Sequence, residues 1–142
     1  MGKKLFTLLL GFSILVVITA VFSKPSIQTV NLKGEKIVVE VADTVAKQIQ
    51  GLSGRASMKN NEGMLFVFKE EAIQSFWMKD MQFSLDILWI DENKIIVGIE
   101  RNVSPDTFPQ TFSPYKPALY VLELNAGWTE KHQVVAGDVL SW

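Results

Sequence analysis

The residues best suited to chemistry combine charge with a large aromatic ring, and they are Arg55, Trp77, Lys79, Asp86 and Glu123. Residues 74–79 and 84–90 each have the pattern of a strand, and the short connection between them suits an antiparallel hairpin. Side chains alternate between the faces of a strand, so Trp77, Lys79 and Asp86 would share one face of that hairpin. A cation, an anion and a ring would then adjoin one another on the floor of a polar binding patch.

Glu123 stands among the apolar residues of another expected strand, 118–124, where an unpaired carboxylate is costly. Arg55, in the glycine-containing turn 51–55, could form a bidentate ion pair with it. Two interpretations of these charges stay open: they form a ligand-binding site, or they are ion pairs that only close one side of the fold. A further alternative is a hydrolase in which Asp86 and Glu123 act as paired carboxylates.

The sequence predicts no metal site and no cofactor, and it assigns no catalytic residue. It contains no cysteine and a single histidine, His132, so neither a zinc site nor a Ser-His-Asp arrangement can be argued. Methionine thioethers can bind Cu(I), but the methionines between Met58 and Met81 have no His or Cys nearby. Met64 and Met78 stand in apolar stretches, which favours a place in the core.

The first residues predict export from the cytoplasm. Lys3 and Lys4 precede an uncharged, mostly apolar run over residues 5–22. Positive charge stays on the cytoplasmic side, so everything after Ser23 is expected outside. The run is long for a signal peptide and short for a membrane span, so cleavage after Ser23 and retention as a membrane anchor both stay open.

The rest of the chain predicts one domain. We expect a leader over residues 1–23, a short tether over 24–35 and a single β-rich domain over 36–142. The net charge of the full chain is −1, and two lysines lie in the leader, so nucleic acid is not expected as a partner. Without cysteines there are no disulfides, and the core alone must hold the fold.

Short alternating stretches predict a mainly β, or β-rich α+β, fold. Beyond the hairpin, we expect strands at 36–41, 64–68, 94–100, 118–124 and 139–142, and short helices at 43–50 and 127–132. Residues 104–117 carry four prolines and read as a loop, whose aromatic rings either plug one end of a barrel or face a ligand. Together these elements predict a small barrel-like antiparallel sheet with one or two short helices, preceded by an N-terminal apolar helix.

Several strings of residues, in this order, resemble the domain of unknown function 192 family. The strings are Gly51-Leu52-Ser53-Gly54-Arg55, Glu62-Gly63-Met64-Leu65-Phe66-Val67-Phe68, Phe76-Trp77-Met78-Lys79, Leu85-Asp86-Ile87, Tyr120-Val121-Leu122-Glu123-Leu124-Asn125-Ala126-Gly127 and Gly137-Asp138. The resemblance implies a compact, mostly β, barrel-like domain that is often exported. It implies no activity, because none is established for the family. Asp80 stands where the family commonly has Asn, and both residues suit a turn.

These observations predict an extracytoplasmic domain that binds a ligand without catalysis. The expected partners are the membrane, through the N-terminal segment, and an unknown small molecule, glycan or peptide at the patch of charged residues. The alternatives are a structural or assembly factor of the cell envelope and the hydrolase described above.

Overall fold

The computed structural model describes residues 26–142, and the expected leader with its apolar helix lies outside the described residues. The strands are β1 (Ser26–Leu32), β2 (Glu35–Ala42), β3 (Glu62–Ala72), β4 (Phe76–Trp77), β5 (Leu85–Ile90), β6 (Ile96–Val103), β7 (Thr111–Phe112) and β8 (Ala118–Asn125). The helices are α1 (Val45–Gln50), the 3₁₀ helix η1 (Pro105–Thr107) and α2 (Trp128–Lys131). The prediction of a mainly β fold with short helices is confirmed. None of the helices over residues 26–142 has the length and apolar character needed to cross a bilayer.

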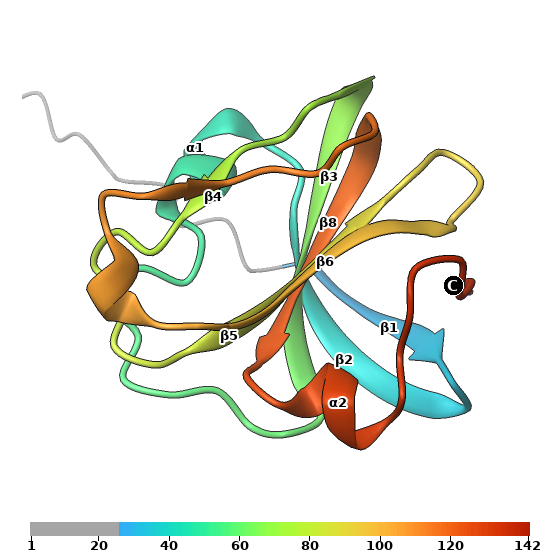
Figure 1. Cartoon of the computed structure of the whole chain (residues 1–142), viewed down its shortest axis with the longest axis horizontal. Coiled ribbons are helices and arrows are strands. Elements are labelled where there is room, and N and C mark those ends of the chain that lie inside the picture. The colour runs from blue at the N-terminus through green and yellow to red at the C-terminus, as the bar shows by residue number, and fades with distance from the viewer. Residues whose placement is uncertain (1–25) are drawn as a thin grey trace, which may run out of the picture.

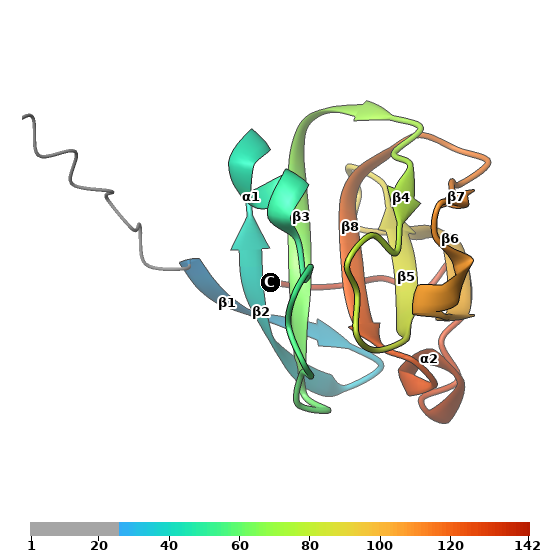
Figure 2. The same cartoon turned by 90° about the vertical axis from the view of Figure 1, so that its left-hand side faces the viewer.

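The main sheet has six strands in the order β1-β2-β3-β8-β5-β6 and is strongly twisted (Figure 1). Strands β2 and β3 are parallel and joined through α1, whereas the other neighbouring strands in this sheet are antiparallel. Strands β4 and β7 form a separate two-stranded ladder. Seen from the side, α1 and β4 lie toward one end of the sheet and α2 at the opposite end (Figure 2).

The predicted barrel-like antiparallel sheet is corrected in two respects: the sheet is mixed, and it does not close, because its edge strands β1 and β6 do not pair with each other. The C-terminal segment lies between these edges. It makes single bridges, Asn31 to Ser141 on one side and Ile95 to Val139 on the other. The expected last strand at 139–142 is therefore a clasp between two edges and not a full ladder.

The predicted tether is also wrong, because residues 26–32 of that stretch form β1. Buried Val30 and Leu32 alternate there with more exposed neighbours, and this alternation along the sequence indicates a strand. The turn Lys33-Gly34 joins β1 to β2 with positive φ at both residues, 55° and 83°. Positive φ at both central residues is what the commonest tight hairpin turn requires.

The predicted hairpin of residues 74–79 and 84–90 does not form. Strand β4 pairs with β7 from the proline-rich segment, with Phe76 opposite Phe112 and Trp77 opposite Thr111. Strand β5 lies between β6 and β8 instead. Every residue of β5 is buried, because its side chains alternate between the two apolar clusters on opposite faces of the sheet.

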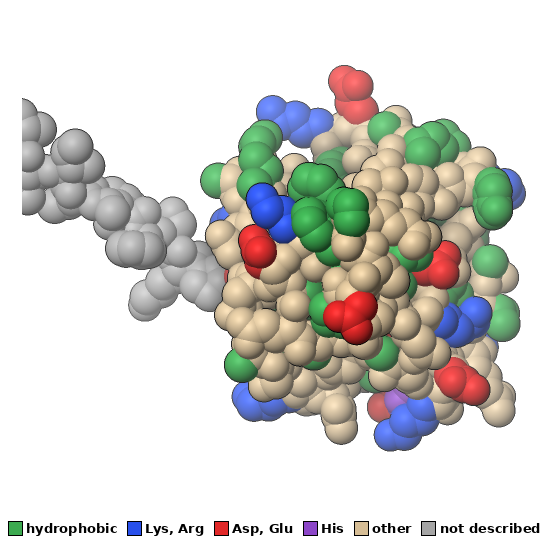
Figure 3. Space-filling model, turned by 60° about the vertical axis from the view of Figure 1, so that its left-hand side comes forward, with side chains coloured by type: hydrophobic (Ala, Val, Ile, Leu, Met, Phe, Trp, Pro, Cys, Tyr) green, Lys and Arg blue, Asp and Glu red, His purple; other side chains and the backbone are tan. Residues whose placement is uncertain are grey.

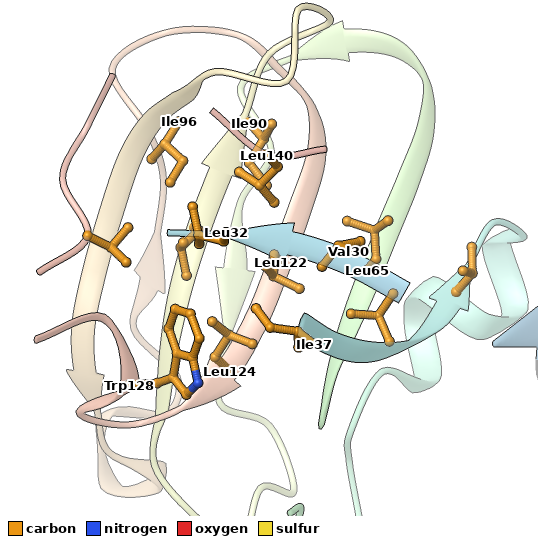
Figure 4. Packing of buried hydrophobic residues seen from close by; sticks show 14 residues of the cluster. Val30, Leu32, Ile37, Leu65, Ile90, Ile96, Leu122, Leu124, Trp128 and Leu140 are labelled. Carbon is orange, nitrogen blue, oxygen red and sulfur yellow. The ribbon is translucent and has the colours of Figure 1, made fainter. Parts of the chain in front are cut away.

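Two apolar clusters cover the two faces of the sheet, because side chains alternate along each strand. The first cluster joins β1 and β2 to β5, β6, β8 and α2, and its labelled members face one another in Figure 4. It includes Val30, Leu32, Ile37, Leu88, Leu122 and Trp128. The second cluster lies on the opposite face, where α1, β4 and β7 are, and includes Met64, Phe66, Met78, Ile87, Trp89 and Val121. Met64 and Met78 are thus core residues, as predicted.

Candidate functional site

A pocket of about 300 Å³ lies between α1 and β4, and we call it the α1–β4 pocket. Its described lining residues are Val45, Gln48, Ile49, Gln50, Gly51, Leu52, Ser53, Phe66, Phe68, Gln74, Ser75, Phe76, Trp77, Met81 and Glu123. The volume is at the small end of the range for ligand sites, and most of the wall is apolar or aromatic, as such sites usually are.

Helix α1 forms one wall and leaves its apolar side chains in solvent. Thr44 caps the helix by accepting a hydrogen bond from the Lys47 amide, and the helix ends at Gly51, whose φ is 49°. Val45 and Ile49 are 70% and 78% exposed, although both line the pocket. A short helix that presents apolar residues to water beside a pocket has the character of a binding rim and not of core packing.

Hydrogen bonds fix this wall to the sheet. Gln48 Nε2 donates to the carbonyl oxygens of Ala42, at the end of β2, and Val67, in β3, at 3.3 and 2.8 Å. Ser53 Oγ donates to the Lys79 carbonyl oxygen at 2.9 Å and so joins the turn after α1 to the segment after β4. The two sides of the pocket are therefore tied together by contacts within the protein.

Aromatic rings form the opposite wall. The Phe76 ring meets those of Phe66 and Phe68 edge to face, with centroids 4.8 and 6.5 Å apart. Trp77 is 52% exposed, and its ring lies 5.8 Å from that of Phe108. The space-filling view shows hydrophobic side chains gathered in the upper half of the face that it presents (Figure 3). The proline-rich segment thus supplies one ring, Phe108, beside the pocket, and another, Phe112, that packs on the second cluster.

Glu123 reaches the same pocket from β8 and is the exceptional group in it. The side chain is 5% exposed, and Oε2 has no hydrogen-bond partner among the described residues. Its cross-strand neighbours are Met64 and Ile87, both buried and apolar. Burial raises the pKa of Glu123 to about 8, against a smaller lowering by the positive charge of Arg55. The carboxyl group is therefore mostly protonated at neutral pH.

A glycine brings β3 close to β8 at this point. A Cβ atom on Gly63 would lie 2.8 Å from the Glu123 carbonyl oxygen and 2.9 Å from Leu124 Cδ2. Only a residue without a side chain fits such an approach. The glycine of the Glu-Gly-Met-Leu-Phe string therefore helps to set the position of Glu123 in the sheet.

Of the five residues proposed from the sequence, Trp77 and Glu123 share the α1–β4 pocket. The predicted pairing of Arg55 with Glu123 is wrong, because Arg55 binds Glu40 at 2.7 Å and lines a separate depression. The Lys79 side chain is exposed and does not line the pocket, although its carbonyl oxygen holds Ser53.

Asp86 has a structural role on the other face of the sheet. It is fully buried and accepts hydrogen bonds from the amides of Asn102, Gly127 and Thr129 and from Thr129 Oγ1. The first residues of α2 are thereby held against β5 and β6, and the free amides at the helix start are satisfied. Asp86 is therefore structural through hydrogen bonds to neutral groups, and among the five residues the predicted kind of contact, an ion pair, is formed by Arg55 with Glu40.

The structure does not bring the two proposed catalytic carboxylates together. In the ladder between β5 and β8, Asp86 lies opposite Leu124 and Ile87 lies opposite Glu123. The two carboxyl side chains therefore lie on opposite faces of the sheet. Residues 26–142 also contain no group of three or more His, Asp or Glu side chains that could hold a metal ion.

Sequence reasoning missed α1, Phe66 and Phe76 as parts of the site. The sequence did carry a signal for the pocket as a whole, because the strings that carry the family resemblance contribute Gly51, Phe66, Trp77 and Glu123 to its lining. The exposure of Val45 and Ile49 had no such signal, because their helical spacing equally suits a buried face.

Known proteins resemble this chain in sequence and in fold. The UPF0127 protein TK1120 of Thermococcus kodakarensis is 30% identical over 73% of this chain, and a UPF0127 protein of Thermococcus gammatolerans is 28% identical over the same share. The aligned regions span 64% and 65% of those relatives, so this chain covers less than two thirds of their length.

Two crystal structures have the same fold. One is R01717 of Sinorhizobium meliloti 1021, a candidate transcription regulator, with a TM-score of 0.79 and 33% identity over 84% of this chain and 95% of that one. The other, from Novosphingobium aromaticivorans, has unknown function, a TM-score of 0.76 and 27% identity over 85% of this chain and 94% of that one.

The family model described as "Uncharacterized ACR, COG1430" matches residues 27–142, from β1 to the end of the chain. This range contains every string that carried the resemblance. The chain belongs to the domain of unknown function 192 family.

Proposed function

We propose that this chain is an extracytoplasmic ligand-binding domain and that the α1–β4 pocket is its binding site. The ligand is a small molecule, because the pocket measures only about 300 Å³. The apolar walls favour a ligand with an apolar body over a glycan, whose hydroxyl groups would need several polar partners.

One observation carries this proposal: at the pocket lies a buried carboxyl group whose Oε2 atom has no hydrogen-bond partner among the described residues. Leaving such a group unpaired costs about 1–3 kcal/mol, and native proteins rarely retain that cost at positions without a function. Glu123 combines this feature with a raised pKa, and perturbed titratable groups in concave sites mark functional positions. The exposed apolar rim of α1 and Trp77 supports the same conclusion from an independent side of the pocket.

The proposed location rests on the N-terminal sequence. Lys3 and Lys4 followed by an apolar run support insertion with the folded domain on the outer face of the cytoplasmic membrane. Fractionation of the native host, detected with an antibody against the domain, tests this. We expect the protein in the membrane or exported fraction, and mass spectrometry of the purified chain will show whether it starts after Ser23. Recovery of the intact chain from the cytosol would refute the location.

The binding proposal is tested by a fragment screen with ligand-observed NMR on the full-length chain. The decisive variant is Ile49→Lys, which places a charged chain on the rim at a position that is 78% exposed and so leaves folding intact. Val135→Lys is the matched control, because Val135 is also exposed and does not line the pocket. Fragments should bind the wild type and Val135→Lys but lose most of their signal with Ile49→Lys. Equal binding to all three proteins would show that the α1–β4 pocket is not the binding site.

A further inference from the structure

We propose that the α1–β4 pocket recognises a small organic cation with an apolar body, whose protonated nitrogen donates a hydrogen bond to the Glu123 carboxylate. This inference rests on the proposed binding function and names the chemical class of the ligand. Three features of the pocket support it: its polar groups, its charges and its aromatic rings.

Among the polar side chains that line the pocket, Glu123 is the one with a fully buried atom that has no hydrogen-bond partner in residues 26–142. Gln48 and Gln50 donate to backbone carbonyl oxygens within the protein, as does Ser53. Ser75 shares a hydrogen bond of 2.8 Å with Ser113. The Glu123 carboxyl group differs, because its Oε2 atom has no partner in the described part of the chain. A ligand that donates a hydrogen bond there would satisfy it.

The charges favour a cation over an anion. Among the described lining residues, Glu123 is the sole acidic or basic side chain, and neither lysine nor arginine nor histidine joins it. A ligand carboxylate or phosphate would therefore meet no counter-charge in the pocket. A cation would meet a carboxylate in a low-dielectric site, where a charge-assisted hydrogen bond is about twice as strong as a neutral one.

The rings favour an organic cation over a metal ion. Phe66, Phe68, Phe76 and Trp77 line the pocket, and the faces of aromatic rings attract organic cations. The same rings, with Val45 and Ile49, offer apolar surface to a hydrocarbon body. A metal ion would need several oxygen or nitrogen ligands, and one carboxylate cannot supply them.

Binding of a cation should release a proton. Burial keeps the Glu123 carboxyl group neutral in the free protein, and an ammonium group beside it favours the ionised form. Of the residues around it, Met64 on β3 and Ile87 on β5 do not titrate, and Arg55 in the turn after α1 is the charged group that acts on it. Affinity should therefore rise with pH up to about pH 8, by as much as about tenfold per pH unit.

The test uses three probes that share one ring and differ in the head group: benzylammonium, benzyl alcohol and benzoate. Each is titrated calorimetrically into the full-length wild type, Glu123→Gln and the control Glu130→Gln, whose exposed side chain does not line the pocket. Titrations in two buffers with different ionisation enthalpies count the protons released. Trp77→Ala provides a second variant at an exposed position, and it should weaken all probes that use the pocket.

We expect benzylammonium to bind the wild type and Glu130→Gln at least about tenfold more tightly than benzyl alcohol, with proton release. Glu123→Gln should lose both the preference and the proton release. If benzyl alcohol or benzoate binds as well as benzylammonium, and Trp77→Ala weakens it, the cation inference is wrong while the binding function stands. If no probe binds any of the proteins, the cation inference is wrong, and the binding function fails with it only if the fragment screen also finds no ligand for the pocket.

Discussion

Asp86 and Glu123 stand one register step apart on the neighbouring strands β5 and β8, yet their carboxyl groups lie on opposite faces of the sheet. Asp86 is saturated with hydrogen bonds from the start of α2 and the end of β6. Glu123 has an oxygen without a partner among the described residues. Two acidic residues that look alike in the sequence therefore differ in role, and different experiments separate them.

Replacement of Asp86 should destabilise the fold. Asp86→Ala leaves the amides of Asn102, Gly127 and Thr129 without their acceptor, so the free energy of unfolding should fall by about 3 kcal/mol or more. Urea unfolding of the full-length chain measures this. Asp106→Ala, on exposed η1, is the control and should change stability by less than about 0.5 kcal/mol. Similar values for the two variants would contradict the structural role.

Glu123 should make stability fall as the pH rises. Between pH 4.5 and pH 8, the unfolded chain has an ionised Glu123 while the folded chain keeps it protonated. The folded state therefore binds the extra proton and loses up to about 1.4 kcal/mol per pH unit from this residue. Glu123→Gln lacks this contribution and should be more stable than the wild type at pH 8, with a smaller difference at pH 5.

Chemical denaturation of both proteins across this pH range measures the difference. Other titrating groups are common to both proteins and cancel. One is Asp138, whose pKa is lowered by a hydrogen bond from the Val135 amide. A constant difference between the wild type and Glu123→Gln from pH 5 to pH 8 would show that Glu123 titrates normally.

Gly63→Ala should destabilise the sheet where β3 meets β8. The new methyl group would overlap the Glu123 carbonyl oxygen, which belongs to the backbone and cannot rotate away. Overpacking of this kind costs about 1–3 kcal/mol. In Gly98→Ala the nearest atom is Pro114 Cβ, at 3.2 Å, so this variant should cost less. Thermal unfolding ranks the two, and the reverse order would count against the close approach at Gly63.

Arg55→Ala should have little effect on stability. Its partner Glu40 forms an exposed ion pair with it, and such pairs contribute about 0–1 kcal/mol. A double-mutant cycle with Glu40→Ala measures the coupling, which should shrink further in high salt. A coupling above about 2 kcal/mol would mean that this pair, and not the buried core, holds the region together.

The sequence contained enough to place individual strands but not their partners. Residues 36–41, 64–68 and 118–124 were predicted as strands because their apolar patterns are local, and β2, β3 and β8 include them. The partner of β4 is β7, with Phe76 opposite Phe112 far along the chain, and no local spacing reports that choice. The hairpin prediction failed for this reason, and the shared face of Lys79 and Asp86 failed with it.

The site was predicted in part for similar reasons. Glu123 was identifiable because a carboxylate within an apolar strand is unusual wherever the strand lies. Trp77 was identified for a hairpin face that does not exist, although it does line the pocket. Arg55 and Asp86 were placed wrongly because their partners, Glu40 and the start of α2, depend on how distant segments meet.

The connection between the parallel strands β2 and β3, residues 43–61, contains all of α1 and the turn at Gly51. One side of the pocket thus belongs to a single continuous insert, while Glu123 and the aromatic rings come from elsewhere in the chain. Grafting this insert from a relative would exchange half of the recognition surface in one step and leave the ladder of the sheet unchanged. Replacement of residues 43–61 alone would therefore change one wall of the pocket while Glu123 and the aromatic rings of the other wall stay in place.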